Sequence, residues 1–156
     1  MTELSIRLAC EKDSAALARL MIEMQRHYNA SHPAQAELEG ELATLPAGVE
    51  VMLAEHDGRL TGLAAFSTIF PGPGISGGFF LKELYISQAD RGAGIGLALM
   101  KALATLAKER GLTRIDWTVG KDNLDAVAFY DRLGGAAQPD RHFYRLNGQA
   151  FATLAS

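Results

Sequence analysis

A glycine-rich segment, Arg91-Gly92-Ala93-Gly94-Ile95-Gly96, stands between a predicted buried strand and a predicted helix. Glycine has no Cβ and accepts positive φ, so consecutive backbone N–H groups can converge on one point. N–H groups at a helix N-terminus bind anions, and the guanidinium of Arg91 adds a cation suited to phosphate. The segment therefore predicts a cradle for a pyrophosphate group.

Two other glycine-rich phosphate sites fit this segment poorly. A P-loop ends in Gly-Lys-Ser/Thr, but Leu97 and Ala98 follow Gly96, so its lysine and its magnesium-binding hydroxyl are missing. A Rossmann site has the spacing G-x-G-x-x-G after an early strand. Here the glycines occupy every second position from Gly92 to Gly96, behind a predicted hairpin. A glycine-rich turn that binds nothing stays open as the alternative.

Two linked motifs in the second half of the chain carry a family resemblance. The segment 91–96 fits the R-x-x-G-x-G/A loop of the GCN5-related N-acetyltransferase (GNAT) superfamily, which the chain therefore resembles. Residues 123–134 are similar to that superfamily's N-x-x-A-x-x-F-Y-x-x-x-G segment, with its Asn, Ala, Phe-Tyr and Gly at Asn123, Ala126, Phe129-Tyr130 and Gly134. Residues 79–146 carry the resemblance, and the earlier part agrees only in the order of its elements. The resemblance implies one N-acetyltransferase domain over residues 1–156.

Within that superfamily, the stretches FFLKELYI and FYRLNGQAF look similar to the diamine and polyamine N-acetyltransferase branch. That branch implies an acidic residue at the position of Lys82, beside the one that matches Glu83. A lysine at this position would repel a polycation. The departure puts a spermidine-like substrate in doubt.

The resemblance also implies which residues bind acetyl-CoA, the acetyl donor. The pantetheine arm is amide-like and can pair with an exposed strand edge, and an N–H near Leu84 or Tyr85 would polarise the thioester carbonyl. In the family, a bulge in this strand opens the gap beside the next strand. The expected coenzyme-binding residues are Leu84, Tyr85, Ile86, Arg91, Gly92, Ala93, Gly94, Ile95, Gly96, Asn123, Ala126, Phe129 and Tyr130.

The expected reaction is acetyl transfer to a primary amine, and it needs a base and an acid. A lysine-like amine has a pKa near 10.4 and must lose a proton before it attacks. Glu83 is the candidate general base, directly or through water, unless it only balances Lys82 or an arginine. Tyr130 matches the family tyrosine that protonates the leaving thiolate, unless it only packs with Phe129. Asn123 caps a helix and is expected to touch the pantetheine, although capping alone explains its presence.

The acceptor is expected between the first helices and the strand at 79–86. The candidate residues there are Glu23, His27, Tyr28, Lys82 and Glu83. An acidic rim would attract a cationic amine, such as a diamine, a polyamine, an amino acid or a lysine analogue, but the same acids could form a solvated helix face. Peptide or protein N-acetylation, and a non-catalytic acetyl-CoA-binding module, are the other functions considered. Many members of the family are homodimers, so the resemblance implies a homodimer.

The elements that must position these residues follow from periodicity and turn residues. Helical spacing predicts helices from Asp13 or Ser14 to about residue 29, from 31–33 to near 46–48, from 94 to 110, and from Asp122 or Asn123 to 133. Alternation predicts strands at 4–8, 49–53, 59–70, 79–86, 114–119 and 143–146, with a tight turn at Asp57-Gly58. The hairpins precede a βαβ unit. We therefore expect an α/β (α+β) fold with a mixed central sheet flanked by helices, and with strands splayed at the acetyl-CoA site.

Composition excludes several other classes. The chain has 156 residues, 48% of them hydrophobic, and one cysteine, so a disordered chain, a disulfide scaffold and a multi-cysteine zinc site are excluded. The histidines show no metal spacing, and no metal is expected. No segment is apolar enough to span a membrane, and the N-terminus does not resemble a signal peptide, so we expect a cytoplasmic protein.

The charge is unevenly distributed along the chain. The net charge is −3, which argues against nucleic-acid binding. Residues 1–81 carry 5 basic and 10 acidic side chains, and residues 82–156 carry 10 basic and 8 acidic ones. This split fits an anionic coenzyme in the second part and a cationic amine near the first, although surface scatter explains it equally well.

Overall fold

The computed structural model describes residues 3–156 and forms two compact units, the first ending at Thr118 and the second comprising Val119–Ser156. The strands are β1 (Leu4–Leu8), β2 (Val49–His56), β3 (Arg59–Ile69), β4 (Gly78–Ile86) and β5 (Ile115–Trp117). The helices are α1 (Ser14–His27), α2 (Gln35–Ala43), α3 (Ile95–Glu109), α4 (Leu124–Arg132) and α5 (Gly148–Leu154). Short 3-10 turns occur at η1 (Glu11–Asp13), η2 (Pro73–Ile75) and η3 (Gln88–Asp90).

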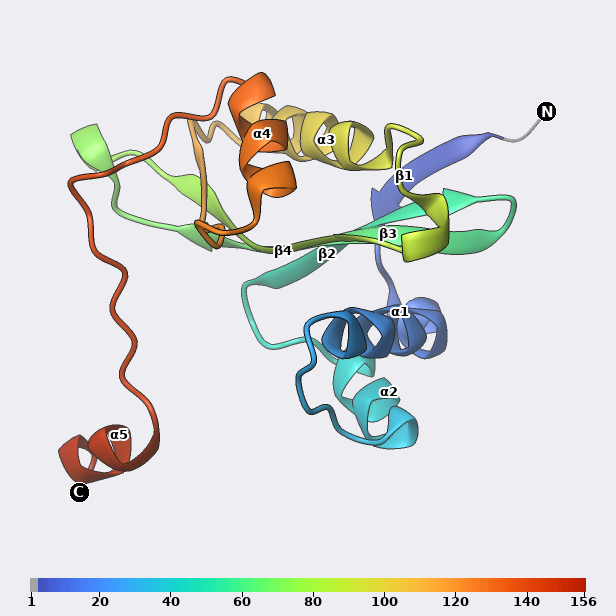
Figure 1. Ribbon diagram of the computed structural model, residues 1–156, viewed down its shortest axis with the longest axis horizontal. Coiled ribbons are helices and arrows are strands. Elements are labelled where there is room, and N and C mark those ends of the chain that lie inside the picture. The colour runs from blue at the N-terminus through green and yellow to red at the C-terminus, as the bar shows by residue number, and fades with distance from the viewer. Residues whose placement is uncertain (1–2) are drawn as a thin grey trace. The chain divides into compact units, whose positions relative to one another are not determined.

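The first unit contains the five-stranded sheet, in the order β1-β2-β3-β4-β5. The first four strands are antiparallel and β5 runs parallel to β4. Helices α1 and α2 cover one face of the sheet and α3 covers the other (Figure 1). The mixed sheet flanked by helices that the sequence predicts is therefore confirmed.

Each face of the sheet buries its own apolar side chains. On the first face, three residues of α1 pack on three strands in one cluster of buried side chains: Leu17, Leu20, Met24, Val51, Leu53, Leu63 and Tyr85. On the opposite face, α3 buries Ile95, Leu99 and Leu103. Gly62 allows α3 a close approach, because a Cβ there would lie 2.8 Å from Ile86 Cδ1 and 3.2 Å from Ile95 Cγ2.

A one-residue β-bulge divides β4 at Lys82. Ala65 of β3 pairs with Glu83, while the next residue, Phe66, pairs with Leu81, so Lys82 is the extra residue. Side chains alternate between faces along a strand, and one inserted residue reverses that alternation. Leu81 therefore faces α3, whereas Glu83 faces α1. The bulge that the resemblance implies is present.

The pairing of β4 with β5 ends one residue before the bulge. Only Phe79, Phe80 and Leu81 of β4 pair with Ile115–Trp117. Within residues 3–156, no strand pairs with the same edge of β4 from Lys82 to Ile86. This open edge agrees with the splayed strands that we expect.

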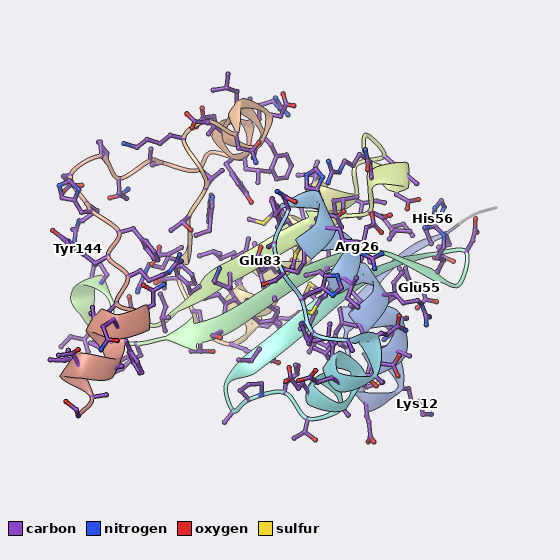
Figure 2. All side chains as sticks on the ribbon, turned by 60° about the horizontal axis from the view of Figure 1, so that its bottom comes forward. Lys12, Arg26, Glu55, His56, Glu83 and Tyr144 are labelled. Carbon is purple, nitrogen blue, oxygen red and sulfur yellow. The ribbon has the colours of Figure 1, made fainter. Side chains whose placement is uncertain are left out.

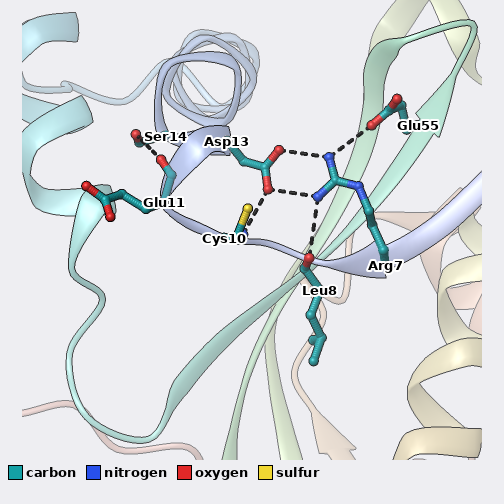
Figure 3. A network of polar contacts seen from close by, with 7 residues as sticks. All are labelled: Arg7, Leu8, Cys10, Glu11, Asp13, Ser14 and Glu55. Atoms are coloured by element: carbon teal, nitrogen blue, oxygen red, sulfur yellow. Dashed lines mark hydrogen bonds and ion pairs between the residues drawn. The ribbon is translucent and has the colours of Figure 1, made fainter.

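The first strand and first helix are joined by a charged network (Figure 3). The guanidinium of Arg7 donates to both oxygens of Asp13 at 2.8 Å and to Glu55 Oε2 at 2.9 Å. Cys10 N also donates to Asp13 Oδ2 at 2.8 Å. The hydrogen bond from Arg7 holds the pKa of Asp13 far below its ordinary value. Asp13 precedes α1 as predicted, but its carboxylate binds Arg7 and does not cap the helix.

The second unit differs from the sequence prediction at its end. Asn123 caps α4, with its Oδ1 accepting from Ala126 N at 3.3 Å, as one of the two predicted caps. The strand predicted at 143–146 is wrong, because these residues form no ladder within the described chain and α5 follows them. Alternating apolar residues specify a strand only when a neighbouring strand accepts their backbone bonds. Among residues 3–156, no helix is long and apolar enough to cross a membrane.

Candidate functional site

The open edge of β4 presents specific backbone groups. Ser87 N donates to Thr61 O at 2.8 Å, so the N–H of Ser87 points to β3. In an antiparallel ladder this direction repeats every second residue. The N–H of Tyr85 therefore also points to β3, and the N–H groups of Leu84 and Ile86 point to the open edge. Of the two residues that the sequence proposes for thioester polarisation, Leu84 is the one whose N–H points to the open edge.

The glycine loop leads from β4 to the first turn of α3. Gly92 has φ 83° and Gly94 has φ 77°, a region that favours glycine. An added Cβ at either residue would have no atom within 4 Å, so the space above the loop is open. Ala98 N donates to Gly94 O at 3.0 Å, which starts the helix. The loop therefore leaves open space beside the first turn of α3, whose N–H groups have no partner within the helix, as the predicted anion cradle requires.

An ion pair fixes the turn that precedes this loop. Both guanidinium Nη atoms of Arg59 donate to Asp90, at 2.9 and 2.8 Å. The side chain of Asp90 is only 11% exposed. Arg91 donates from Nε to Ile86 O at 3.2 Å, and its guanidinium carbon lies 5.4 Å from the centre of the Tyr85 ring. Arg91, the predicted phosphate ligand, thus lies at the end of the open edge.

Glu83 faces the end of α1, where Tyr28 lies. Burial raises the pKa of the Tyr28 hydroxyl, and the negative charge of Glu83 raises it further. Lys82 Nζ lies 3.3 Å from Glu83 Oε1, and the Lys82 side chain is 64% exposed. The candidate base is therefore paired with an exposed surface cation, which an incoming ammonium group could replace.

Glu23 connects α1 to the end of β4. Its Oε1 accepts from Tyr85 Oη, Ser87 Oγ and Gln88 N, each at 3.0 Å. Burial raises the pKa of Glu23, but these hydrogen bonds and the charge of Arg91 outweigh it and hold the pKa below its ordinary value. Burial and the bond to Glu23 raise the pKa of Tyr85 to about 12. Glu23 is therefore ionised at neutral pH and Tyr85 keeps its proton.

Aromatic rings connect these groups into one surface. The His27 ring lies 5.2 Å from Tyr28 and 6.0 Å from Tyr85, measured between ring centres. The first unit therefore brings together seven predicted residues that are far apart in sequence: Glu23, His27, Tyr28, Lys82, Glu83, Tyr85 and Arg91. Figure 2 shows Arg26 on α1 and Glu83 on β4.

A cleft of about 320 Å³ opens beside this surface and is lined by Arg19, Glu23, Arg26, His27, Tyr85 and Gln88. Arg19, Arg26 and Gln88 were not predicted from the sequence, nor was the Arg59–Asp90 pair. The helical residues had a usable signal: Arg19 lies four residues before Glu23, and Arg26 lies three residues after it, so they share one helix face. Gln88 and Arg59 had none, since their contacts join segments that only the fold brings together.

The remaining predicted residues lie in the second unit. On α4, the rings of Phe129 and Tyr130 are 5.3 Å apart. The cap at Asn123 fixes the start of this helix, and Ala126 supplies the capped N–H. Described residues 3–156 hold no group of three or more His, Cys, Asp or Glu side chains suited to a metal ion.

Comparison with known proteins identifies the family. The model of the acetyltransferase (GNAT) family matches residues 15–135, which is most of the chain. The chain belongs to this family. Similar GNAT relatives include L-ornithine N5-acetyltransferase NATA1 of Arabidopsis thaliana, 26% identical over 64% of this chain and 43% of its own. Thialysine N-epsilon-acetyltransferase of Caenorhabditis elegans is 39% identical over 34% of this chain and 33% of its own.

A solved structure shares the fold of this chain. The integron cassette protein VCH_CASS6, from the mobile metagenome of V. cholerae, is 31% identical and has a TM-score of 0.90. That match covers 97% of both chains. By contrast, this chain spans less than half the length of the two curated relatives named above.

Proposed function

We propose that this GNAT chain transfers an acetyl group from acetyl-CoA to a primary amine of a small molecule. The bulge at Lys82 carries the proposal. It turns Glu83 toward α1 while the N–H of Leu84 points to an open strand edge. A proton acceptor for the amine and a hydrogen-bond donor for the thioester carbonyl thereby occupy adjacent residues.

The residues fit the coenzyme. The open space above Gly92 and Gly94 has room for the pyrophosphate, and the open edge at 84–86 can pair with the amide-like pantetheine. When bound, acetyl-CoA supplies the activated acetyl group. From α4, we propose that Asn123, Ala126, Phe129 and Tyr130 contribute to the same site.

Proton transfer needs two side chains. Glu83 accepts the proton of the amine, directly or through water, once the ammonium group has displaced Lys82. The N–H of Leu84 polarises the acetyl carbonyl and stabilises the negative charge that develops on its oxygen. Tyr130 donates a proton to the leaving thiolate.

The acceptor site is proposed on the surface formed by Glu23, His27, Tyr28, Lys82 and Glu83. Two relatives are named for ornithine and thialysine, both small amines. Their names support a small amine here, and the cleft of about 320 Å³ has a size suited to one.

We further propose that residues 1–156 act as one acetyltransferase domain and that the protein is a homodimer. Five apolar side chains near the C-terminus are more than half exposed: Phe143, Tyr144, Leu146, Phe151 and Leu154. Exposed apolar groups of this kind favour association. Sedimentation equilibrium decides the oligomeric state, and a concentration-independent monomer would contradict the dimer. Cytoplasmic location remains a prediction from the sequence.

The test of acetyl transfer is release of free thiol from acetyl-CoA with a panel of diamines, polyamines, diamino acids and lysine-containing peptides. Turnover with small amines supports the proposal. Turnover with peptides alone would favour a protein acetyltransferase. Thermal stabilisation by acetyl-CoA without turnover on any amine would favour a non-catalytic binding module.

A further inference from the structure

The cleft between α1 and the end of β4 carries an excess of positive charge. Arg19 and Arg26 both line it, and both side chains are exposed. Within residues 3–156, neither guanidinium forms a salt bridge or a side-chain hydrogen bond. The carboxylate in the cleft, Glu23, is already bound by Tyr85, Ser87 and Gln88. The two arginines are therefore available to a ligand.

We propose that this cleft binds an anionic group of the acceptor, a carboxylate, so that the enzyme prefers amines that also carry an acid. The inference rests on the proposed acetyl transfer and names the acceptor class for it. A guanidinium presents two parallel N–H groups that match the two oxygens of a carboxylate. An ammonium ion has no favourable partner among Arg19, Arg26 and Lys82.

The position of the cleft fits an acceptor with two functional groups. Tyr85 lines the cleft and lies on the same strand face as Glu83, two residues along β4. A strand rises roughly 3.3 Å per residue, so these positions are about 7 Å apart. An extended diamino acid of the size of ornithine or lysine can place its side-chain amine at Glu83 and its carboxylate beside Arg26.

The phosphates of the coenzyme are the other anions that such a cleft could bind, because Arg91 lies against Tyr85. The two sources differ in their kinetic consequence. A carboxylate site changes the KM for the amine, whereas a phosphate site changes the KM for acetyl-CoA. The structure favours the carboxylate, since Gly92 and Gly94 already form an anion cradle outside the cleft.

The test compares matched acceptors, L-ornithine with putrescine and L-lysine with cadaverine, which differ only in the carboxylate. The wild-type protein should show a higher kcat/KM for each amino acid. Arg26→Gln and Arg19→Gln should lower that value about tenfold for the amino acid, as expected for the loss of one charged hydrogen bond. The values for putrescine and cadaverine should not fall. Lys12→Gln, a change of an exposed cation on η1, is the control.

Calorimetric titration of the CoA-bound protein with L-ornithine and with putrescine separates this inference from the catalytic proposal. Weaker binding of ornithine by Arg26→Gln supports the carboxylate site in the cleft, whether or not any amine is acetylated. If no amine is acetylated, only the proposal of acetyl transfer is refuted. Equal losses for both members of a pair would overturn the inference. A rise confined to the KM for acetyl-CoA, or ornithine binding that Arg19→Gln and Arg26→Gln leave unchanged, would also overturn it.

Discussion

Tyr85 of β4 donates its hydroxyl hydrogen to Glu23 of α1, with 3.0 Å between the two oxygens. The same carboxylate accepts from Ser87 and from the backbone of Gln88. One side chain of α1 thus holds the end of the strand from which the glycine loop begins.

Glu23→Gln should loosen this connection. An amide offers one uncharged acceptor oxygen in place of a carboxylate, and its NH₂ group would stand where Oε2 now accepts from Ser87 Oγ. We expect a loss of about 2 kcal/mol in the free energy of unfolding and faster hydrogen exchange at the Gln88 amide. Glu37→Gln, at an exposed position on α2, should change neither quantity. Unchanged protection of Gln88 would contradict the role given to Glu23.

Gly94→Ala should weaken acetyl-CoA binding beyond its effect on stability. Positive φ costs a residue with a Cβ about 1 kcal/mol, and the added methyl group would occupy the space above the cradle. Gly111, at the opposite end of α3, also has positive φ and no atom within 4 Å of an added Cβ. Gly111→Ala should therefore cost similar stability and leave the Kd for acetyl-CoA unchanged. Equal Kd values for the two variants would remove Gly94 from the binding site.

Tyr130→Phe should lower kcat by at least about tenfold, because the leaving thiolate loses its proton donor. The Kd for acetyl-CoA should change little, since the ring is retained. Stopped-flow thiol release and equilibrium titration measure the two quantities. An unchanged kcat would exclude Tyr130 as the acid.

Lys82→Glu should improve the acceptance of polycations. The lysine ammonium lies 3.3 Å from Glu83 Oε1, where it competes with a cationic substrate. Replacing it with a carboxylate should lower the KM for spermidine and putrescine, and Lys82→Met should produce a smaller decrease. A KM that responds equally to both variants would show that charge at this position does not select the acceptor.

Asp13→Asn should destabilise the protein in a pH-dependent way. The native pKa of Asp13 lies below its ordinary value of 3.8, so its stabilisation is complete above that value and is lost as the pH falls through the native pKa. At pH 7 we expect a loss of about 2 kcal/mol, moderated by the partial exposure of Arg7. The difference from wild type in urea unfolding should shrink below about pH 4. Asp57→Asn, in the exposed hairpin turn, should have little effect at any pH.

Local signals predicted the parts of the fold that local chemistry determines. Asp57-Gly58 marked the β2–β3 turn, where both residues have positive φ, and Gly111 marked the end of α3. The glycine loop was predictable for the same reason, since Gly92 and Gly94 also have positive φ. The prediction of a strand at 143–146 was wrong, because a strand forms only beside a partner strand, which no local pattern reveals.

The acceptor surface was only partly predictable. Glu23 and Tyr85 were both candidates, but their hydrogen bond joins residues 62 positions apart. Arg7 and Asp13 are close in sequence, yet the pattern around Asp13 indicated a helix cap. Where a side chain has several possible partners, its actual partner can be assigned only when the fold shows which one lies nearest.

The bulge at Lys82 also separates two kinds of constraint within a single strand. Before it, Phe79 and Leu81 are buried and belong to the packing against α3. From the bulge onward, Lys82 is exposed and Glu83 is half-buried at the proposed acceptor surface, whereas Tyr85 is buried in the cluster under α1. Substitutions at Lys82 and Glu83 should therefore alter which amine is accepted without repacking that cluster. These two positions give the protein a route to new acceptors by single substitutions.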